Sequence, residues 1–206
     1  TSMDNLALTL GAQGDLAGAR ALHEQTLATR REVLSERHPD TLASMHNLAT
    51  TLYDQGDFVG AQALQEQVLA CRRELIGERH ANTLRSMNNL AATLSAQGNL
   101  AGARALEEQA LLIRREKLGE RHSDTTQSAW NVFLTLLKLD AVENADHVRN
   151  DHLAWLLDAT EESLSGQQRQ IRDWLRDLGD RDAQRTRMSR AAGWLRRRRR
   201  PRPPNE

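Results

Sequence analysis

The chain has 206 residues, of which 39% are hydrophobic, 27% charged and only 3% aromatic, and its formal net charge is zero. Its many Ala and Leu residues favour helices, while it contains no run of about 18 apolar residues that could span a membrane. Because Cys71 is the single cysteine and no secretory signal pattern is visible, we expect no internal disulfide and a reducing, cytoplasmic location.

A sequence repeat with a period of 42 residues begins at the start of the chain. SMDNLA at 2–7 returns as SMHNLA at 44–49, as SMNNLA at 86–91 and, weakly, as SAWNVF at 128–133. A start inside this pattern, without an initiator Met, indicates a piece of a longer protein. The period predicts four units, the last one degenerate, at about 1–40, 41–82, 83–124 and 125–160.

Each unit is predicted to contain two helices joined by a tight turn. In the second unit, apolar residues at helical spacing predict a first helix over about 41–54 and a second over about 58–76. Gly56 is expected to end the first helix in the left-handed conformation, and Asp57 to cap the second. The small residues that we expect to let the partner helix approach closely are Gly60 and Ala61.

A polar stretch recurs between units, as ERHPDTL, ERHANTL and ERHSDT. We interpret it as a turn in which Pro39 favours a loop and a following residue caps the next helix. The predicted capping residues are Asp40, Asn82 and Asp124. The histidines in successive units would lie on the order of 10 Å apart, too far to share one metal ion. We therefore interpret as structural, with a pH-sensitive or ligand role as the alternative, His38, His80 and His122.

These units resemble tetratricopeptide repeats (TPRs). The residues that carry the resemblance are NLA, a Leu three residues on, QGD, a following Ala and the EQxL of the second helix. The usual repeat has about 34 residues, whereas the longer period, with RRE, LGE and HPDTL, is similar to the kinesin-light-chain type. Similar repeats occur in bacterial signalling ATPases of the STAND class and in proteins with caspase-like domains. The resemblance implies an all-α, right-handed superhelical solenoid over 1–140.

In the resembling family, the first helices line a concave groove that binds extended peptides, and an Asn on each first helix holds the peptide backbone. Carried over by motif position, these residues are Asn5, Asn47, Asn89 and Asn131. Asn is unfavourable inside a helix, and its amide matches a peptide group; a bond to a neighbouring helix is the alternative. The other residues expected to contact a peptide are His46, Asn88, Arg85, Trp130, Thr50 and Tyr53.

Specificity is expected at the position just before each Asn, because Asp4, His46, Asn88 and Trp130 differ in every unit. Arg85 on the inner face could pair with a ligand carboxylate or simply be exposed to solvent.

The fourth unit departs from the pattern, because Asp140 stands where Gly98 stood, and we expect an altered turn there. Helices are predicted across about 142–160 and 167–178. Residues 141–178 are expected to cap the apolar end of the solenoid. Trp155 and Trp174 are expected in the core of this cap. His147 and His152 are five residues apart and do not share a helix face, which argues against a metal site.

Residues 179–206 are predicted to be a polar linker followed by a disordered tail, whose last eleven residues contain six Arg and one Glu. Such a tail could contact nucleic acid or an anionic lipid surface, act as an import signal, or only solubilise the chain. The consecutive arginines are Arg196, Arg197, Arg198, Arg199 and Arg200.

No catalytic motif is visible, because the chain lacks a P-loop, a GxSxG and an HExxH sequence. Cys71 recurs in no other unit, and we interpret it as a buried small residue. We therefore predict no enzyme activity and no cofactor. The predicted function is a protein-interaction scaffold that binds an extended peptide or partner protein. The alternatives are a sensor arm of a larger STAND-type signalling ATPase, a self-assembly module, and nucleic-acid binding through the tail.

Overall fold

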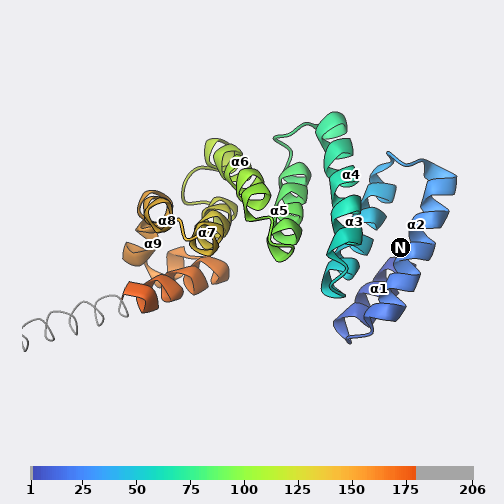
Figure 1. Ribbon diagram of the computed structural model, residues 1–206, viewed down its shortest axis with the longest axis horizontal. Coiled ribbons are helices and arrows are strands. Elements are labelled where there is room, and N and C mark those ends of the chain that lie inside the picture. Colours follow the sequence, from blue (N-terminus) through green and yellow to red (C-terminus); the bar gives the residue numbers. More distant parts are fainter. Residues whose placement is uncertain (1, 180–206) are drawn as a thin grey trace, which may run out of the picture.

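The computed structural model describes residues 2–179, in which every regular element is a helix (Figure 1). Each of the seven long helices packs against the next, and together they form the predicted solenoid of helix–turn–helix units. These helices are α1 (Ser2–Ala12), α2 (Leu16–Leu34), α3 (Pro39–Asp54), α4 (Phe58–Ile76), α5 (Ala81–Ala96), α6 (Leu100–Leu118) and α7 (Ser123–Lys138). Within the described residues, none of the helices has the length and apolar character needed to cross a lipid bilayer.

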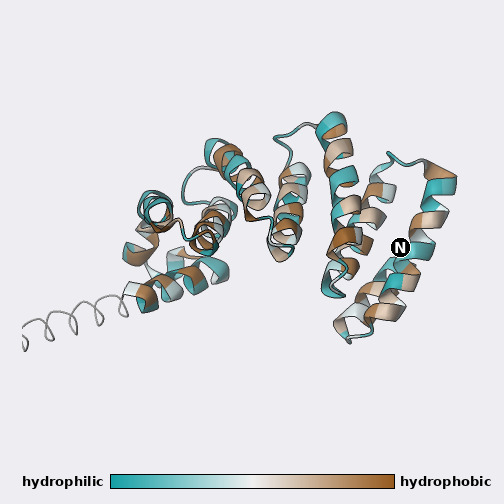
Figure 2. Cartoon of the chain, viewed as in Figure 1, coloured by the Kyte–Doolittle hydropathy of each residue, from teal (hydrophilic) through white to brown (hydrophobic). Residues whose placement is uncertain are grey.

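Hydrophobic and hydrophilic residues are interspersed along each helix (Figure 2), as expected of amphipathic helices that bury one face and expose the other. The buried apolar residues form successive clusters along the solenoid, each shared by neighbouring units. Of the predicted linker and tail over 179–206, residues 180–206, with Arg196 to Arg200, lie outside the described residues.

The turn within each unit follows the prediction. Gly56 has a φ of +80°, and the Asp57 carboxylate accepts a hydrogen bond from the backbone N–H of Gly60 at 3.0 Å. A Cβ atom on Gly60 would lie 2.8 Å from that carboxylate. Gly60 therefore makes room for the helix cap, and at the equivalent Gly18 a Cβ atom would also lie 3.1 Å from the Leu10 side chain of the partner helix. Ala61 is fully buried, as such a helix contact requires.

The histidine of each turn between units caps the first helix of the next unit. This corrects the prediction that the caps are Asp40, Asn82 and Asp124. In each unit the imidazole Nδ1 accepts the backbone N–H two residues further on, at 3.1 Å. The first helix therefore begins one residue after the histidine. Pro39 consequently lies in the first helical turn and not in a loop, because proline's missing N–H costs nothing there. These capping bonds give a structural role to His38, His80 and His122.

An arginine, buried in the second and third units and half-buried in the first, ties each second helix to the first helix of the next unit. Arg72 Nη1 donates to Ser86 Oγ at 2.7 Å and to the Asn82 carbonyl at 3.2 Å. Burial lowers the pKa of Arg72, with a smaller contribution from the nearby charge of Arg85. The equivalent Arg–Ser bonds are 2.5 Å and 2.6 Å long and join Arg30 to Ser44 and Arg114 to Ser128.

The turn of the fourth unit keeps the backbone path of the earlier units but is altered at its cap, because Ala141 gives α8 no side-chain cap where Asp15, Asp57 and Asn99 cap the earlier second helices. Asp140 adopts a φ of +56°, in the left-handed region that Asp tolerates better than most residues. The backbone N–H of Ala141 donates to the Leu136 carbonyl at 3.0 Å, as Asn99 does to Leu94 at 2.8 Å.

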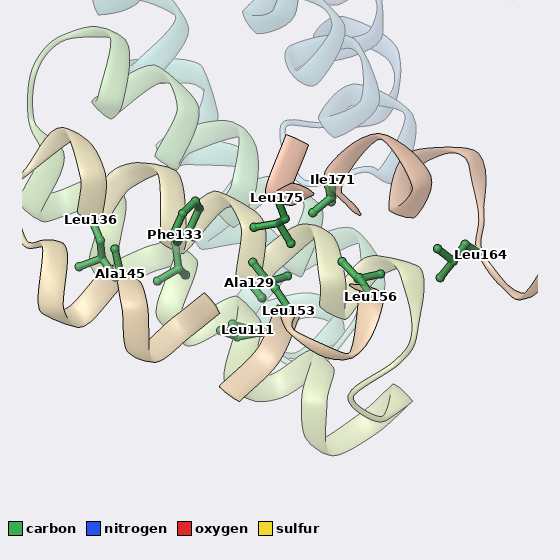
Figure 3. Close-up of a cluster of buried hydrophobic side chains, with 11 residues drawn as sticks. Leu111, Ala129, Phe133, Leu136, Ala145, Leu153, Leu156, Leu164, Ile171 and Leu175 are labelled. Carbon is green, nitrogen blue, oxygen red and sulfur yellow. The ribbon is translucent and has the colours of Figure 1, made fainter. Parts of the chain in front are cut away.

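The C-terminal segment covers the end of α7. It consists of α8 (Val142–Val148), a π-helical stretch (Arg149–Leu153), α9 (Trp155–Asp158), a short 3₁₀ turn (Glu161–Ser163) and a helix over 166–179. The predicted helix over 142–160 is thus interrupted by π-helical geometry. The side chain of Gln168 donates to the Arg121 carbonyl and to the Thr126 hydroxyl, at 3.0 and 3.1 Å. The buried residues that this segment packs against Phe133 and Leu136 include Leu153, Leu156, Ile171 and Leu175 (Figure 3).

Candidate functional site

Two cavities lie between consecutive first helices of the solenoid. The first, of about 140 Å³, lies between α3 and α5 and is lined by Thr50, Tyr53, Gln65, Asn89 and Ala92. The second, of about 220 Å³, lies mainly between α5 and α7 and is lined by Tyr53, Asn88, Ala92, Ser95, Ala96, Glu107, Asn131, Leu134, Thr135 and Lys138. Tyr53 and Ala92 line both cavities, so the two are adjacent, and we refer to them together as the groove.

Half of the predicted contact residues line the groove, namely Thr50, Tyr53, Asn88, Asn89 and Asn131. The others do not line either cavity. Asn5 and Arg85 are exposed, on α1 and α5, whereas Asn47 is half-buried on α3. The predicted row of asparagines therefore reaches the groove in the third and fourth units.

Two of these asparagines make hydrogen bonds within the protein. The Asn89 side chain donates to Nδ1 of His46 at 3.3 Å. Burial, assisted by the charges of Arg85 and Arg72, lowers the pKa of His46 to about 4, so its imidazole is neutral and can accept this bond at neutral pH. A side-chain amide has two donors and one acceptor, so this bond uses only part of the capacity of Asn89.

The Asn131 amide is positioned from its own helix. Its Oδ1 accepts a hydrogen bond from Gln127 Nε2, one turn earlier on α7, at 2.7 Å. This bond, like the one between Asn89 and His46, matches the alternative in which the asparagines stabilise the stack. It also fixes the direction in which the Asn131 amide presents its N–H groups.

Trp130 belongs to an aromatic cluster between α7 and the helix over 166–179. Its ring stacks on Phe133 with centroids 5.4 Å apart and meets Trp174 edge-on at 4.8 Å. Trp130 is half-buried in this cluster, and Trp174 is 38% exposed, so only part of Trp174 lies in the predicted core. Trp155 is half-buried against the same core, with the Arg121 guanidinium 5.6 Å above its ring.

The second helices also contribute buried polar side chains to the groove, at positions that were not among the predicted contact residues. Gln65 on α4 and Glu107 on α6 occupy equivalent positions of their units, and each is 5% exposed. Neither Gln65 Oε1 nor Glu107 Oε2 has a hydrogen-bond partner among the described residues. The signal was present, because His23, Gln65 and Glu107 put a polar residue at the same repeat position of three units.

Glu107 is the one carboxylate among the described residues that line the groove. Burial raises the pKa of Glu107, while a hydrogen bond to Thr135 and the charge of Lys138 partly oppose this effect. Within residues 2–179, no cluster of three or more His, Cys, Asp or Glu side chains could hold a metal ion.

Comparison with known proteins agrees with this architecture. The family model described as "Tetratricopeptide repeat" matches residues 1–74 and 46–116. Among solved structures, the chain is similar to the nearly identical TPR-like repeats of a candidate kinesin light chain from Podosopora anserina. The structure of these repeats with a glutamine-to-methionine substitution is 25% identical to this chain in sequence, with a TM-score of 0.78. The alignment covers 95% of this chain and 92% of that chain. The form of the same repeats without this substitution is 24% identical over the same shares of both chains, again with a TM-score of 0.78.

A more distant likeness shows the fold alone. BtubC (BKLC) from P. vanneervenii is 22% identical over 72% of this chain and 62% of that chain, with a TM-score of 0.60. No curated protein matches this sequence.

Proposed function

The chain belongs to the tetratricopeptide repeat family, whose repeats generally serve as protein-interaction scaffolds, and we propose that it binds an extended peptide segment of a partner protein in the groove. The observation that carries the proposal is the succession of two adjacent cavities along α3, α5 and α7, with amide side chains in the lining of both. Each cavity is smaller than the roughly 300–1,000 Å³ of a typical small-molecule pocket. Two small adjacent cavities suit a chain of small groups better than one compact ligand.

An extended peptide presents a main-chain amide about every 3.3 Å, so amide side chains at several points of the groove can bind it regardless of its sequence. Asn89 and Asn131 are the residues that we assign to this contact. Their orientation is set by His46 and Gln127, respectively. A bond that orients an amide before binding lowers the entropy lost when the ligand arrives.

Selectivity in this proposal comes from the side chains that differ between units. Thr50 and Tyr53 flank the first cavity, whereas Leu134 and Glu107 contribute an apolar and an acidic group to the second. Peptide side chains that enter the two cavities would therefore meet different chemistry.

The test is a selection from a displayed peptide library on the wild-type chain and on an Asn89→Ala/Asn131→Ala variant. Removal of two hydrogen-bonding groups is expected to weaken the selected peptides by roughly 10- to 100-fold. Asn144→Ala serves as the matched control, because Asn144 is exposed on α8 and does not line the groove. Circular dichroism verifies that all three proteins are folded.

The proposal is refuted if the wild-type chain selects no peptide, or if the double variant binds the selected peptides as tightly as the control does.

A further inference from the structure

The cavity between α5 and α7 contains a carboxylate that the fold leaves incompletely paired. Glu107 is 5% exposed, and although Thr135 hydrogen-bonds to its carboxylate, its Oε2 atom has no hydrogen-bond partner among the described residues. Lys138 is the cation on the same cavity, but its Nζ atom donates to Ser95 Oγ at 3.0 Å. A buried charge without a full set of partners is unfavourable, so the fold by itself gains little from a carboxylate here.

The preceding unit shows that packing does not require this charge. Gln65 occupies the equivalent position on α4, is also 5% exposed, and has nearly the same shape without the charge. Burial disfavours the ionised form of Glu107 and raises its pKa, an effect that a Gln at this position would avoid. The negative charge in the third unit therefore points to a ligand and not to stability.

A second unpaired acceptor lies on the same cavity. Oδ1 of Asn88 is buried and has no hydrogen-bond partner among the described residues, and Asn88 lines the cavity together with Glu107. Two unpaired acceptors, one of them anionic, favour a cation that carries several N–H donors. A guanidinium group has five such donors in a planar arrangement, and a cavity of about 220 Å³ is several times the roughly 30 Å³ occupied by one water molecule.

We propose that this cavity is a subsite for an arginine side chain of the bound peptide, with Glu107 as its anionic partner and Asn88 as a second acceptor. The proposal rests on the proposed function, because it assigns the chemistry of one side chain of that peptide. It also assigns a role to Lys138, whose positive charge competes with the incoming guanidinium.

The subsite is tested with a small probe, independently of peptide selection. N-acetyl-arginine methylamide is titrated into the ¹⁵N-labelled chain, and the side-chain amide signals of Asn88 and Asn131 are followed by NMR. The matched neutral probe is N-acetyl-citrulline methylamide, which has the same shape without the charge. The arginine probe is expected to produce saturable shifts at an affinity about tenfold higher than that of the citrulline probe.

Glu107→Gln is the decisive variant, because it converts the third unit to the residue found in the second. It is expected to weaken the arginine probe about tenfold, while urea unfolding shows it to be at least as stable as the wild type. Lys138→Ala, which removes the competing cation, is expected to strengthen binding of the same probe. Equal binding of the two probes, or unchanged arginine binding in Glu107→Gln, overturns the proposal.

The failures of the two proposals are distinguishable. A chain that selects peptides through its asparagines, but shows no arginine-specific shift, keeps the proposed function and loses the subsite. A chain that shows the arginine-specific shift but selects no peptide keeps the cation site and loses the extended-peptide function.

Discussion

The turn that follows each second helix provides a sharp test of backbone strain in this chain. Three equivalent residues have nearly the same conformation: Ser35 with φ 92° and ψ 160°, Gly77 with φ 82° and ψ 160°, and Gly119 with φ 86° and ψ 166°. This region of backbone conformation is essentially restricted to glycine. Ser35→Gly is therefore expected to stabilise the first unit.

The magnitude follows from two opposing terms. A non-glycine residue in this region costs about 1–3 kcal/mol, whereas a new glycine gives the unfolded chain extra freedom worth about 0.4–1 kcal/mol. Ser35 is exposed, so its replacement by glycine changes no buried contact. The net expectation is a stabilisation of roughly 1 kcal/mol, or about 2–4 °C in Tm for a chain of this size.

The assay is urea unfolding monitored by far-UV circular dichroism. The urea midpoints are compared on condition that the dependence of the free energy of unfolding on urea concentration is unchanged. Gly77→Ser is the matched reverse variant, because a Cβ atom on Gly77 would meet no atom within 4 Å, so that steric clash cannot contribute. It is expected to destabilise the chain by a similar amount. An unchanged or lower midpoint for Ser35→Gly, together with an unaffected Gly77→Ser, would refute the reasoning.

Three further predictions concern the contacts between units. His80→Ala removes the cap of α5 and is expected to lower the free energy of unfolding by about 1 kcal/mol, measured by urea unfolding against an unaffected His147→Ala variant on α8. Arg72→Met, which leaves the buried Ser86 hydroxyl without its arginine partner, is expected to cost about 1–3 kcal/mol, and a double-mutant cycle with Ser86→Ala should reveal coupling between them. The pKa of His46 is lowered from 6.5 to about 4. Between these two pH values, the folded state therefore binds fewer protons than the unfolded state. The free energy of unfolding should therefore fall as the pH drops from 6.5 towards 4, by at most about 1.4 kcal/mol per pH unit. A His46→Gln variant whose free energy of unfolding depends on pH in the same way would show that His46 is not the cause.

Several features of the fold could be predicted because they depend on residues close together in the chain. The 42-residue period places Gly56 and Asp57 at a helix–helix turn, and both have the predicted roles there. The choice between His80 and Asn82 as the cap of α5 could not be made in the same way, because both residue types can accept a backbone N–H. Only the extended backbone at His80 directs its imidazole to that N–H.

The candidate site was predictable in part. Asn89 and Asn131 were identified from the repeat motif, and both line the groove. Asn5 and Asn47 carry the same motif but line neither cavity, and their contact with a peptide remains a prediction. The placement of the chain in a larger signalling ATPase or in a self-assembled array also remains a prediction.

The amino-acid sequence by itself determined the repeat, the pairing of helices and the family, since these follow from apolar spacing and turn residues that recur within each unit. Tertiary structure alone decided that Gln65 and Glu107 are buried beside the groove and that Asn89 bonds to His46, which lies 43 residues earlier. The physical reason is that a side chain's burial and hydrogen bonds depend on the neighbouring units that pack around it. In a solenoid those neighbours are a whole period away, beyond the reach of any local pattern.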